Sequence, residues 1–376
     1  NPTIFPEQLK FVKPWQAKRQ FFNSSWWFYG SIEKFNAADK TNLIAIQTGV
    51  YYPGVGKSNQ EIAALSRSRH QSQGFGSTGV RGEETEYLEF INGDALKEKK
   101  SLFEGIDTTW NRVKGGKPIG ELLTKITVEF DHKNPSGSIP NLLKAYSMLQ
   151  ALDDNHWAPL KSAEIKEIIV ACSGLYLEAV AQNQEATPGS NIKLKLEAIN
   201  RSSIPMQLLS VTSLPNIIKT AQNQDLKNNI LNTINLDLQL PETINYTQPY
   251  WLKENGSVGM YAVNEQLNIG IPDIIREIKV VFNMRINGIE LPFERTVIYK
   301  YNDDVKGEIY NYLDIVPDVT TSILDKVLLF TDNKNKRVEV KIKAGKDAVK
   351  GILKLELPKN WGVIPESIPF EISKKG

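Results

Sequence analysis

The sequence is poor in the residues that build covalent cross-links and metal sites. It holds one cysteine, Cys172, and three histidines, His70, His132 and His156, in 376 residues. A single cysteine excludes a disulfide within the chain and a zinc site built from several thiolates. No two histidines stand four residues apart, as paired ligands on a helix would. We therefore expect no metal or other cofactor held by this chain.

The sequence also lacks an excess of basic residues and a long apolar stretch, and each absence excludes one class of function. Lys and Arg number 45 against 43 for Asp and Glu, so the net charge of +2 lacks the basic excess typical of nucleic-acid binding. The longest apolar stretch lies at residues 168–177. That is about half of the roughly 20 residues that a membrane-spanning helix needs. We expect no nucleic-acid partner and no membrane-spanning segment.

Apolar residues at 41% and charged residues at 23% are present in ordinary amounts, which predicts folded domains. At roughly 100–200 residues per domain, the length allows two to four of them. We interpret the chain as a multidomain α+β protein. Its expected parts are a partial α/β segment, a helical segment and one or two immunoglobulin-like β-sandwiches, at 1–112, 113–173, 174–308 and 309–376.

The first zone alternates short strands with one helix. Residues 20–29 and 42–48 are rich in aromatic and β-branched side chains, which favours strands. Ser58 and Glu61 form the S-x-x-E capping box of a helix. The buried side of that helix is expected to carry Ile62 and Leu65. The βαβ-like alternation predicts an α/β layer, but the zone is too short for a complete one.

The second zone has apolar residues at helical spacing. Three helices are expected, one beginning near Pro118, one over 142–152 and one over 165–172, with Gly174 as the stop of the third. Cys172 lies on the apolar stripe of the third helix. We interpret it as a buried and unreactive thiol.

From residue 174 onward the apolar period changes to two. The alternating or apolar runs that predict strands lie at 192–198, 236–240, 278–286 and 295–301. Asn287-Gly288 between two apolar runs predicts a tight hairpin. Size and pattern are typical of an immunoglobulin-like sandwich. Alternation at 338–343 and 353–357 predicts a second β domain, either minimal or truncated.

Three motifs that look catalytic fail on their context. The run Gly-Val-Gly-Lys-Ser at 54–58 ends like a P-loop, but the first glycine of that motif would stand where Tyr51 is. The G-x-G-x-x-G run at 74–79 follows a helix, whereas a dinucleotide site needs a strand before it. We interpret it as a glycine-permitted loop. There is no G-x-S-x-G run to support a serine hydrolase.

The histidines differ in their surroundings. His132 and His156 stand in turn-like runs and are interpreted as solvated. His70 ends the predicted helix just before the glycine loop, so it is either a cation at a helix C-terminus or a group at the edge of a cleft. Aromatic residues crowd 5–52, and we interpret them as core packing in preference to a surface that stacks sugars or bases.

Three runs near the N-terminus carry a family resemblance. They are Phe-Pro-Glu-Gln-Leu at 5–9, Pro-Trp-Gln-Ala-Lys-Arg at 14–19, and the run at 61–74 with its A-L-x-x-x-x-H-x-S-Q pattern. Together they resemble the second half of a PIG-L/LmbE-like domain. That family resembles the enzyme that de-N-acetylates N-acetylglucosaminyl-phosphatidylinositol.

The resemblance extends over nearly the whole chain. Segments similar to those of large multidomain relatives, typical of Bacteroidetes-like bacteria, lie at 171–175, 187–189, 197–201, 248–252 and 301–308. The run at 357–365 is similar to bacterial immunoglobulin-like accessory domains of carbohydrate-active enzymes.

The resemblance implies a zinc-dependent N-deacetylase that acts on an N-acetylated sugar or glycoconjugate. The family's zinc ligands lie in a His-Pro-Asp-Asp motif and a later histidine, both upstream of the matching region and absent from this sequence. We expect zinc in a longer parent, the N-terminal half of the domain as a partner, and no activity of this chain alone. The resemblance marks His70, Gln73 and, less closely, Arg67 as residues that bind substrate or support the metal ligands.

Whether the chain belongs to an enzyme stays open. The alternative is a non-catalytic protein that binds carbohydrate or a surface partner and keeps a degenerate deacetylase remnant, or whose β domains are spacers without ligand. Immunoglobulin-like modules on a sugar-modifying domain are typical of exported proteins. We therefore expect the periplasm or the cell surface.

Overall fold

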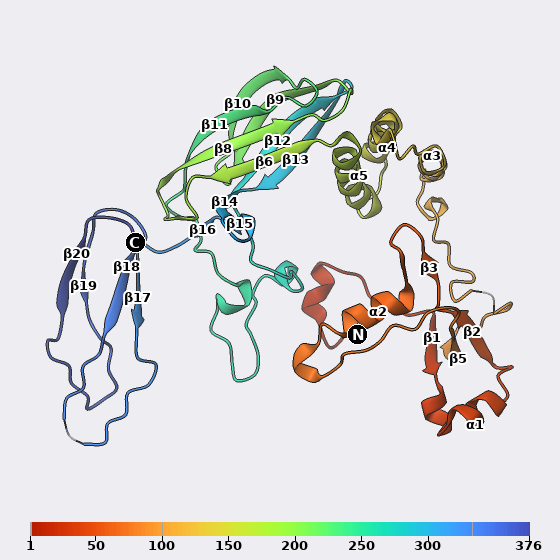
Figure 1. Ribbon diagram of the computed structural model, residues 1–376, viewed down its shortest axis with the longest axis horizontal. Helices are drawn as coiled ribbons and strands as arrows, with labels where there is room; N and C mark the ends of the chain where they lie inside the picture. Colours follow the sequence, from red (N-terminus) through yellow and green to blue (C-terminus); the bar gives the residue numbers. More distant parts are fainter. Residues whose placement is uncertain (1, 100, 333) are drawn as a thin grey trace. The chain divides into compact units, whose positions relative to one another are not determined.

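The computed structural model describes residues 2–99, 101–332 and 334–376 (Figure 1). The chain divides into two units, the first ending at Thr108 and the second covering Thr109–Gly376. Both contain strands and helices, so the architecture is multidomain and mixed α+β, as the sequence predicts. Among the described residues, no helix combines the length and the apolar character that a bilayer crossing requires.

The first unit contains a three-stranded sheet. Its strands, in spatial order, are β1 (Arg19–Ser24), β5 (Thr85–Gly93) and β2 (Leu43–Gln47). The predicted βαβ alternation is wrong, because β5 lies between the other two and pairs antiparallel with both. The strand expected at 20–29 ends early, since Trp26–Tyr29 forms a 3-10 helix.

The other elements of the first unit are short. They are the strand pair β3 (Tyr51–Tyr52) and β4 (Lys57–Ser58), the helices α1 (Ile32–Ala37) and α2 (Asn59–Arg67), and 3-10 turns at Pro6–Lys10 and Gln71–Gln73. The predicted capping box at the start of α2 is confirmed. Ser58 Oγ accepts from the Glu61 amide at 3.3 Å, and Glu61 Oε2 accepts from the Ser58 amide at 3.0 Å.

The first unit has almost no core of its own. Among its described residues, Ile44 and Ala64 are the only buried apolar side chains. The expectation that Ile62 and Leu65 lie on a buried side is wrong, because they are 40% and 55% exposed. Within the described residues of the first unit, no segment packs over that side of α2 to bury them.

The aromatic run of the first unit is also mostly exposed, so its interpretation as core packing is wrong. Edge-to-face contacts join Tyr29 to Phe35 and Phe35 to Tyr87, with ring centroids 5.1 and 5.5 Å apart. The exposed aromatic side chains in this region include Trp15, Trp26, Trp27, Phe28, Tyr51 and Tyr52.

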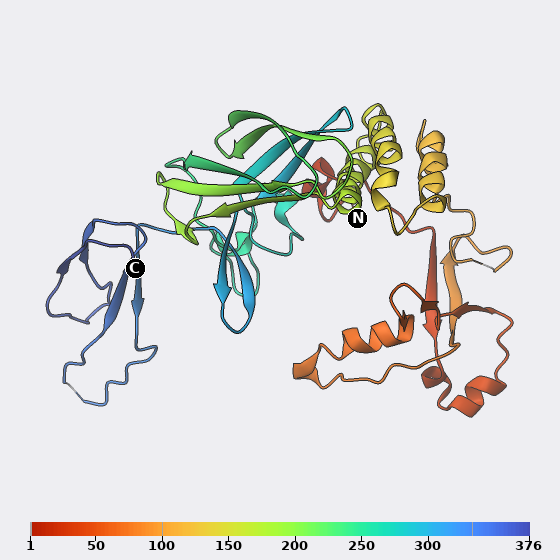
Figure 2. The ribbon, with the colours of Figure 1, turned by 45° about the horizontal axis from the view of Figure 1, so that its top comes forward.

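The second unit begins with three helices that lie side by side (Figure 2). They are α3 (Lys117–Val128), α4 (Ile139–Gln150) and α5 (Trp157–Ser173). Gly174, with φ +59, ends α5, which confirms the predicted stop. Cys172 is half-buried on α5, and burial raises the pKa of its thiol. The raised pKa keeps the thiol protonated, so an unreactive cysteine agrees with the structure.

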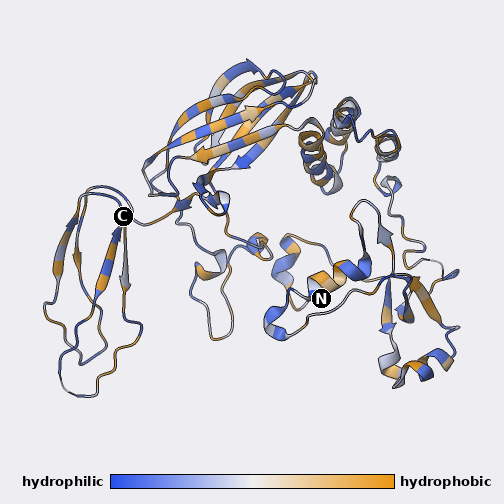
Figure 3. Cartoon of the chain, in the orientation of Figure 1, coloured by the Kyte–Doolittle hydropathy of each residue, from blue (hydrophilic) through white to orange (hydrophobic). Residues whose placement is uncertain are grey.

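Two β-sheets follow the helices. The four-stranded sheet consists of β10 (Ile218–Asp225), β9 (Met206–Leu214), β12 (Lys279–Ile286) and β13 (Ile289–Thr296), in that order. The five-stranded sheet consists of β11 (Asn232–Gln239), β8 (Asn191–Ile199), β6 (Tyr176–Ala181), β14 (Ile298–Asp303) and β15 (Gly307–Tyr312). Hydropathy alternates along these strands (Figure 3), so each sheet has one apolar face.

The apolar faces of the two sheets share one core, which continues into α4 and α5. Phe282 of β12 and Leu196 of β8 are fully buried in it, as is Ile169 of α5. The strand expected at 295–301 is interrupted at Val297, which is 1% exposed and joins β13 of one sheet to β14 of the other. The predicted Asn287-Gly288 hairpin is confirmed, because φ is positive at both residues and Ile286 faces Ile289.

The last part of the second unit consists of strand pairs. The pairs are β7 (Glu185–Ala186) with β16 (Asp314–Ile315), β17 (Val319–Ile323) with β18 (Val340–Ala344), and β19 (Val349–Leu353) with β20 (Ile368–Ile372). The strand expected at 353–357 is wrong, because β19 ends at Leu353. From Val319 onward, Ala344 and Val349 are the only buried apolar side chains of the described residues.

Replacement of Phe282 by alanine tests the shared core. Phe282 is fully buried between the sheets, so we expect F282A to lower the free energy of unfolding of the second unit by about 3–5 kcal/mol. Urea unfolding followed by circular dichroism measures the loss. The control I217A removes a side chain that is 79% exposed and should change stability by less than about 0.5 kcal/mol. Equal losses in the two variants would contradict this assignment of the core.

Candidate functional site

The end of α2 brings two of the three sequence-predicted site residues into contact. Nδ1 of His70 lies 3.0 Å from Oε1 of Gln73. The short 3-10 turn at Gln71–Gln73 produces this contact, because it folds the chain back within three residues. Gly74 ends the turn with φ +68, a conformation that favours glycine.

Arg67 joins the pair through an aromatic ring that the sequence analysis missed. The Arg67 guanidinium lies 5.3 Å from the centroid of the Phe75 ring, and the His70 ring lies edge-on to Phe75 at 6.1 Å. Phe75 thus connects the arginine with the histidine. The available signal was an aromatic residue directly after the glycine that ends the H-x-S-Q tail.

The side chains of this group face solvent. Arg67, His70, Gln73 and Phe75 are all exposed. An amide oxygen only accepts hydrogen bonds, so the contact with Gln73 places the proton of neutral His70 on Nδ1 and leaves Nε2 as an acceptor. The group therefore offers one acceptor nitrogen and one guanidinium cation to a molecule outside it.

The glycine run at 74–79 belongs to the same surface. Its chain runs back along α2, where the Ser77 amide donates to Ser68 Oγ at 3.2 Å. A Cβ on Gly79 would lie 2.9 Å from the Cα of Glu61, so this close approach requires glycine. Arg81 closes the loop with an ion pair to Glu61 at 3.0 Å. The run therefore forms a loop whose course depends on its glycines, as the sequence predicts.

The other two histidines lie elsewhere. His132 and His156 are exposed, as the sequence predicts, and each contacts its neighbouring aromatic ring, Phe130 and Trp157. Across the described residues, no three His, Cys, Asp or Glu side chains are grouped so as to hold a metal ion. The residues present do not fit a zinc site.

A charged cluster on the outer face of the five-stranded sheet is satisfied internally. Buried Glu178 binds Lys300 at 2.7 Å, and Lys300 also pairs with Glu308 at 3.2 Å. Burial opposes the charge of Lys300, but the hydrogen bonds to Glu178 and Glu308 outweigh it and raise the pKa of Lys300. With each charge paired, this cluster leaves no free charged group for a ligand, and removal of one partner would leave a buried charge unpaired.

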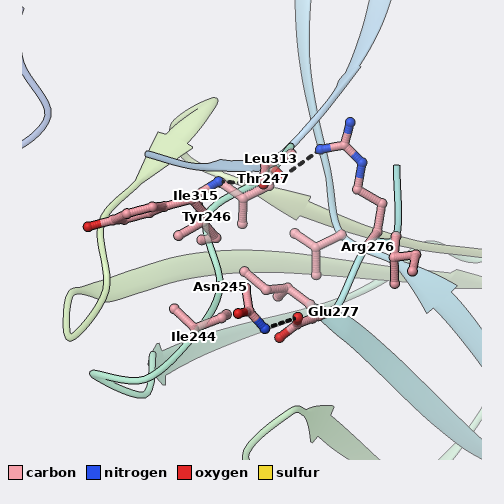
Figure 4. A pocket seen from close by; sticks show the side chains of 11 residues that line it. Ile244, Asn245, Tyr246, Thr247, Arg276, Glu277, Leu313 and Ile315 are labelled. Carbon is pink, nitrogen blue, oxygen red and sulfur yellow. Dashed lines mark hydrogen bonds between the residues drawn. The ribbon is translucent and has the colours of Figure 1, made fainter. Parts of the chain in front are cut away.

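A small cavity near Arg276 is also structural (Figure 4). Its volume of about 30 Å³ leaves room for one water molecule. Arg276 Nη1 donates to Asp314, and Asn245 Nδ2 donates to Glu277 at 2.8 Å. Thr247 Oγ1 accepts from the Ile315 amide at 2.8 Å. The bonds of Arg276 and Thr247 attach the long connection between β11 and β12 to β16, and the Asn245–Glu277 bond joins the two ends of that connection.

Comparison with known protein families found no family model that matches the chain, and comparison with curated proteins found no match. The family assignment therefore rests on the motifs quoted above and is a proposal.

The capping box of α2 generates a prediction about acid. Hydrogen bonds from the Ser58 amide lower the pKa of Glu61, and the Arg81 charge adds to this. A carboxyl whose pKa is lowered by folding stabilises above its unfolded pKa, about 4.5, and loses that contribution as the pH falls through the folded pKa. E61Q keeps an acceptor for the Ser58 amide but no longer titrates. We expect the Ser58 amide resonance to shift between pH 7 and pH 3 in the wild type and to stay nearly constant in E61Q.

The matched control is E83Q, on an exposed glutamate nearby. In E83Q the Ser58 amide resonance should shift between pH 7 and pH 3 as it does in the wild type. An unchanged acid shift in E61Q would show that another group controls the start of α2.

Proposed function

We propose that the chain is the downstream part of a zinc-dependent N-deacetylase that acts on N-acetylated sugars. The first unit is the back of its catalytic domain, and Arg67, His70 and Gln73 line the substrate cleft. The observation that carries the proposal is the uncovered apolar surface of the first unit, which a complete domain would bury.

The extent of that surface supports a covering partner. Trp15, Trp27 and Phe103 are 84%, 72% and 64% exposed. A segment of this length normally encloses a core of its own, so the many exposed apolar side chains favour a partner that covers them. The motif resemblance identifies the partner as the front half of the same domain, which carries the His-Pro-Asp-Asp motif.

The chemistry divides between the two halves. Zinc would polarise the acetamide carbonyl and activate water, but its ligands have to come from the front half because the residues described here do not fit it. His70 contributes Nε2 as an acceptor for a substrate hydroxyl or for a hydrogen-bond donor beside the metal site. Arg67 contributes a cation for a polar group of the substrate.

The β part fits accessory modules of such an enzyme. We assign the two sheets between Tyr176 and Tyr312 to an immunoglobulin-like sandwich and the strand pairs after Val319 to a second immunoglobulin-like β domain. Modules of this type on a sugar-modifying domain support export to the periplasm or the cell surface.

One observation favours the alternative, a non-catalytic carbohydrate- or surface-binding protein with a degenerate remnant. Exposed indole rings such as Trp15 and Trp27 suit stacking on sugar rings if no protein covers them. In the first candidate the front half of the domain covers those rings, whereas in the alternative a sugar stacks on them. A gene that encodes the front half upstream therefore favours the first candidate, and a gene that lacks it favours the alternative.

Turnover of an N-acetylglucosamine conjugate tests the proposal. We expect no acetate release by this chain alone, with or without added zinc. The full gene product should release acetate, and H70A in it should lower kcat/KM by about 10–100-fold, as loss of a residue beside a metal site does. Acetate release is measured with a coupled enzymatic assay.

The matched control is H132A, which removes an exposed histidine of the second unit and should leave kcat/KM unchanged. A gene without a His-Pro-Asp-Asp motif upstream, or stoichiometric zinc and turnover in this chain alone, would overturn the proposal.

A further inference from the structure

We propose that a neutral sugar residue binds in a cavity at the junction between the five-stranded sheet and the last strand pairs. This junction cavity has a volume of about 330 Å³, at the small end of the range for ligand pockets. Sites at such junctions are common because two elements together supply groups that neither has alone. The residues that the argument uses are Gln182, Asn183, Glu185, Thr187, Asn191 and Asp347.

The two walls of the junction cavity are held in place by backbone contacts. The amides of Asp314 and Val316 donate to the carbonyls of Gln184 and Ala186 at 2.9 and 2.8 Å. On the other wall, the Gly345 amide donates to Asp318 at 2.8 Å.

Gly345 is required for this approach. A Cβ at that position would lie 2.3 Å from the Pro317 carbonyl oxygen and 3.1 Å from Cγ2 of Thr187. The walls therefore form a close junction that any larger residue would force apart.

The cavity offers both exposed and buried polar groups. The side-chain amides of Gln182, Asn183 and Asn191 are exposed and make no hydrogen bond to another described residue. Thr187 is 1% exposed, and its Oγ1 is buried without a partner. A buried hydroxyl without a hydrogen bond is costly, so a polar ligand or a water molecule would stabilise it.

Two carboxylates, of Glu185 and Asp347, and three lysines, Lys193, Lys346 and Lys375, line the cavity. Glu185 pairs with Lys343 at 2.7 Å and with Lys375 at 3.9 Å. Asp347 accepts from the Lys375 amide at 2.8 Å and pairs with Lys374 at 3.3 Å. Carboxylates that are paired in this way do not form a cation site.

These observations define the ligand class. Amide groups both donate and accept, so three unpartnered amides match the adjacent hydroxyl groups of a sugar ring. Buried Ala181 and Ala186 and half-buried Ile192 supply apolar contact for the C–H face of the ring. Because every group belongs to the second unit, the inference does not rest on the deacetylase proposal.

Binding of free monosaccharides to the whole chain tests the inference. The probes are glucose, galactose and N-acetylglucosamine, with glucuronate as the anionic comparison, each titrated by NMR of the backbone amides. We expect at least one neutral sugar to give saturable shifts at residues 182–193 and 345–347. The double variant N183A/N191A should bind that sugar about tenfold more weakly, because it loses two hydrogen bonds.

The matched control is Q184A, on an exposed residue between Asn183 and Glu185 that does not line the cavity. It should bind with unchanged affinity. Absence of saturable binding by all neutral sugars, binding by glucuronate alone, shifts confined to other residues, or equal affinity of N183A/N191A would each overturn the inference. The location of the shifts in the wild type decides the matter even if the double variant misfolds. Acetate release by the full gene product is a separate readout, so the deacetylase proposal stands or fails independently.

Discussion

Burial of apolar surface between the two sheets is the constraint on which the structured part of this protein depends. Phe282 and Met284 of β12 meet the inner side chains of the five-stranded sheet, and the same core extends to Ile169 of α5. Because that core is continuous, the helices and the two sheets form one unit. The loops and strand pairs at its ends are positioned by this body.

The first unit shows the opposite condition. Its helix caps, turns and edge-to-face ring contacts are well formed, yet Ile44 and Ala64 are the only apolar side chains buried among its described residues. Local hydrogen bonds define the shape of α2, but they contribute far less stability than burial of a complete core. The surface that carries His70 therefore keeps its shape through local contacts more than through a buried core.

Local signals in the sequence were reliable where they act within a few residues. The Ser58–Glu61 capping box, the Asn287-Gly288 hairpin and the Gly174 stop all occur where expected. Features that depend on distant partners could not be found in this way. The antiparallel sheet of the first unit depends on β5, and exposure of Ile62 depends on what covers α2. Phe75 could be assigned to the site only from the structure, because the turn after α2 places its ring beside the His70 ring.

The attachment of the last strand pairs combines two kinds of contact with different responses to the surroundings. Backbone pairing of β7 with β16 is insensitive to ionic strength, whereas the ion pairs of Glu185 with Lys343 and Lys375 are partly exposed and weaken as salt screens them. A rise in salt therefore removes part of the attachment and leaves the backbone pairing in place. The end of the molecule keeps its connection to the two sheets through hydrogen bonds that salt does not screen.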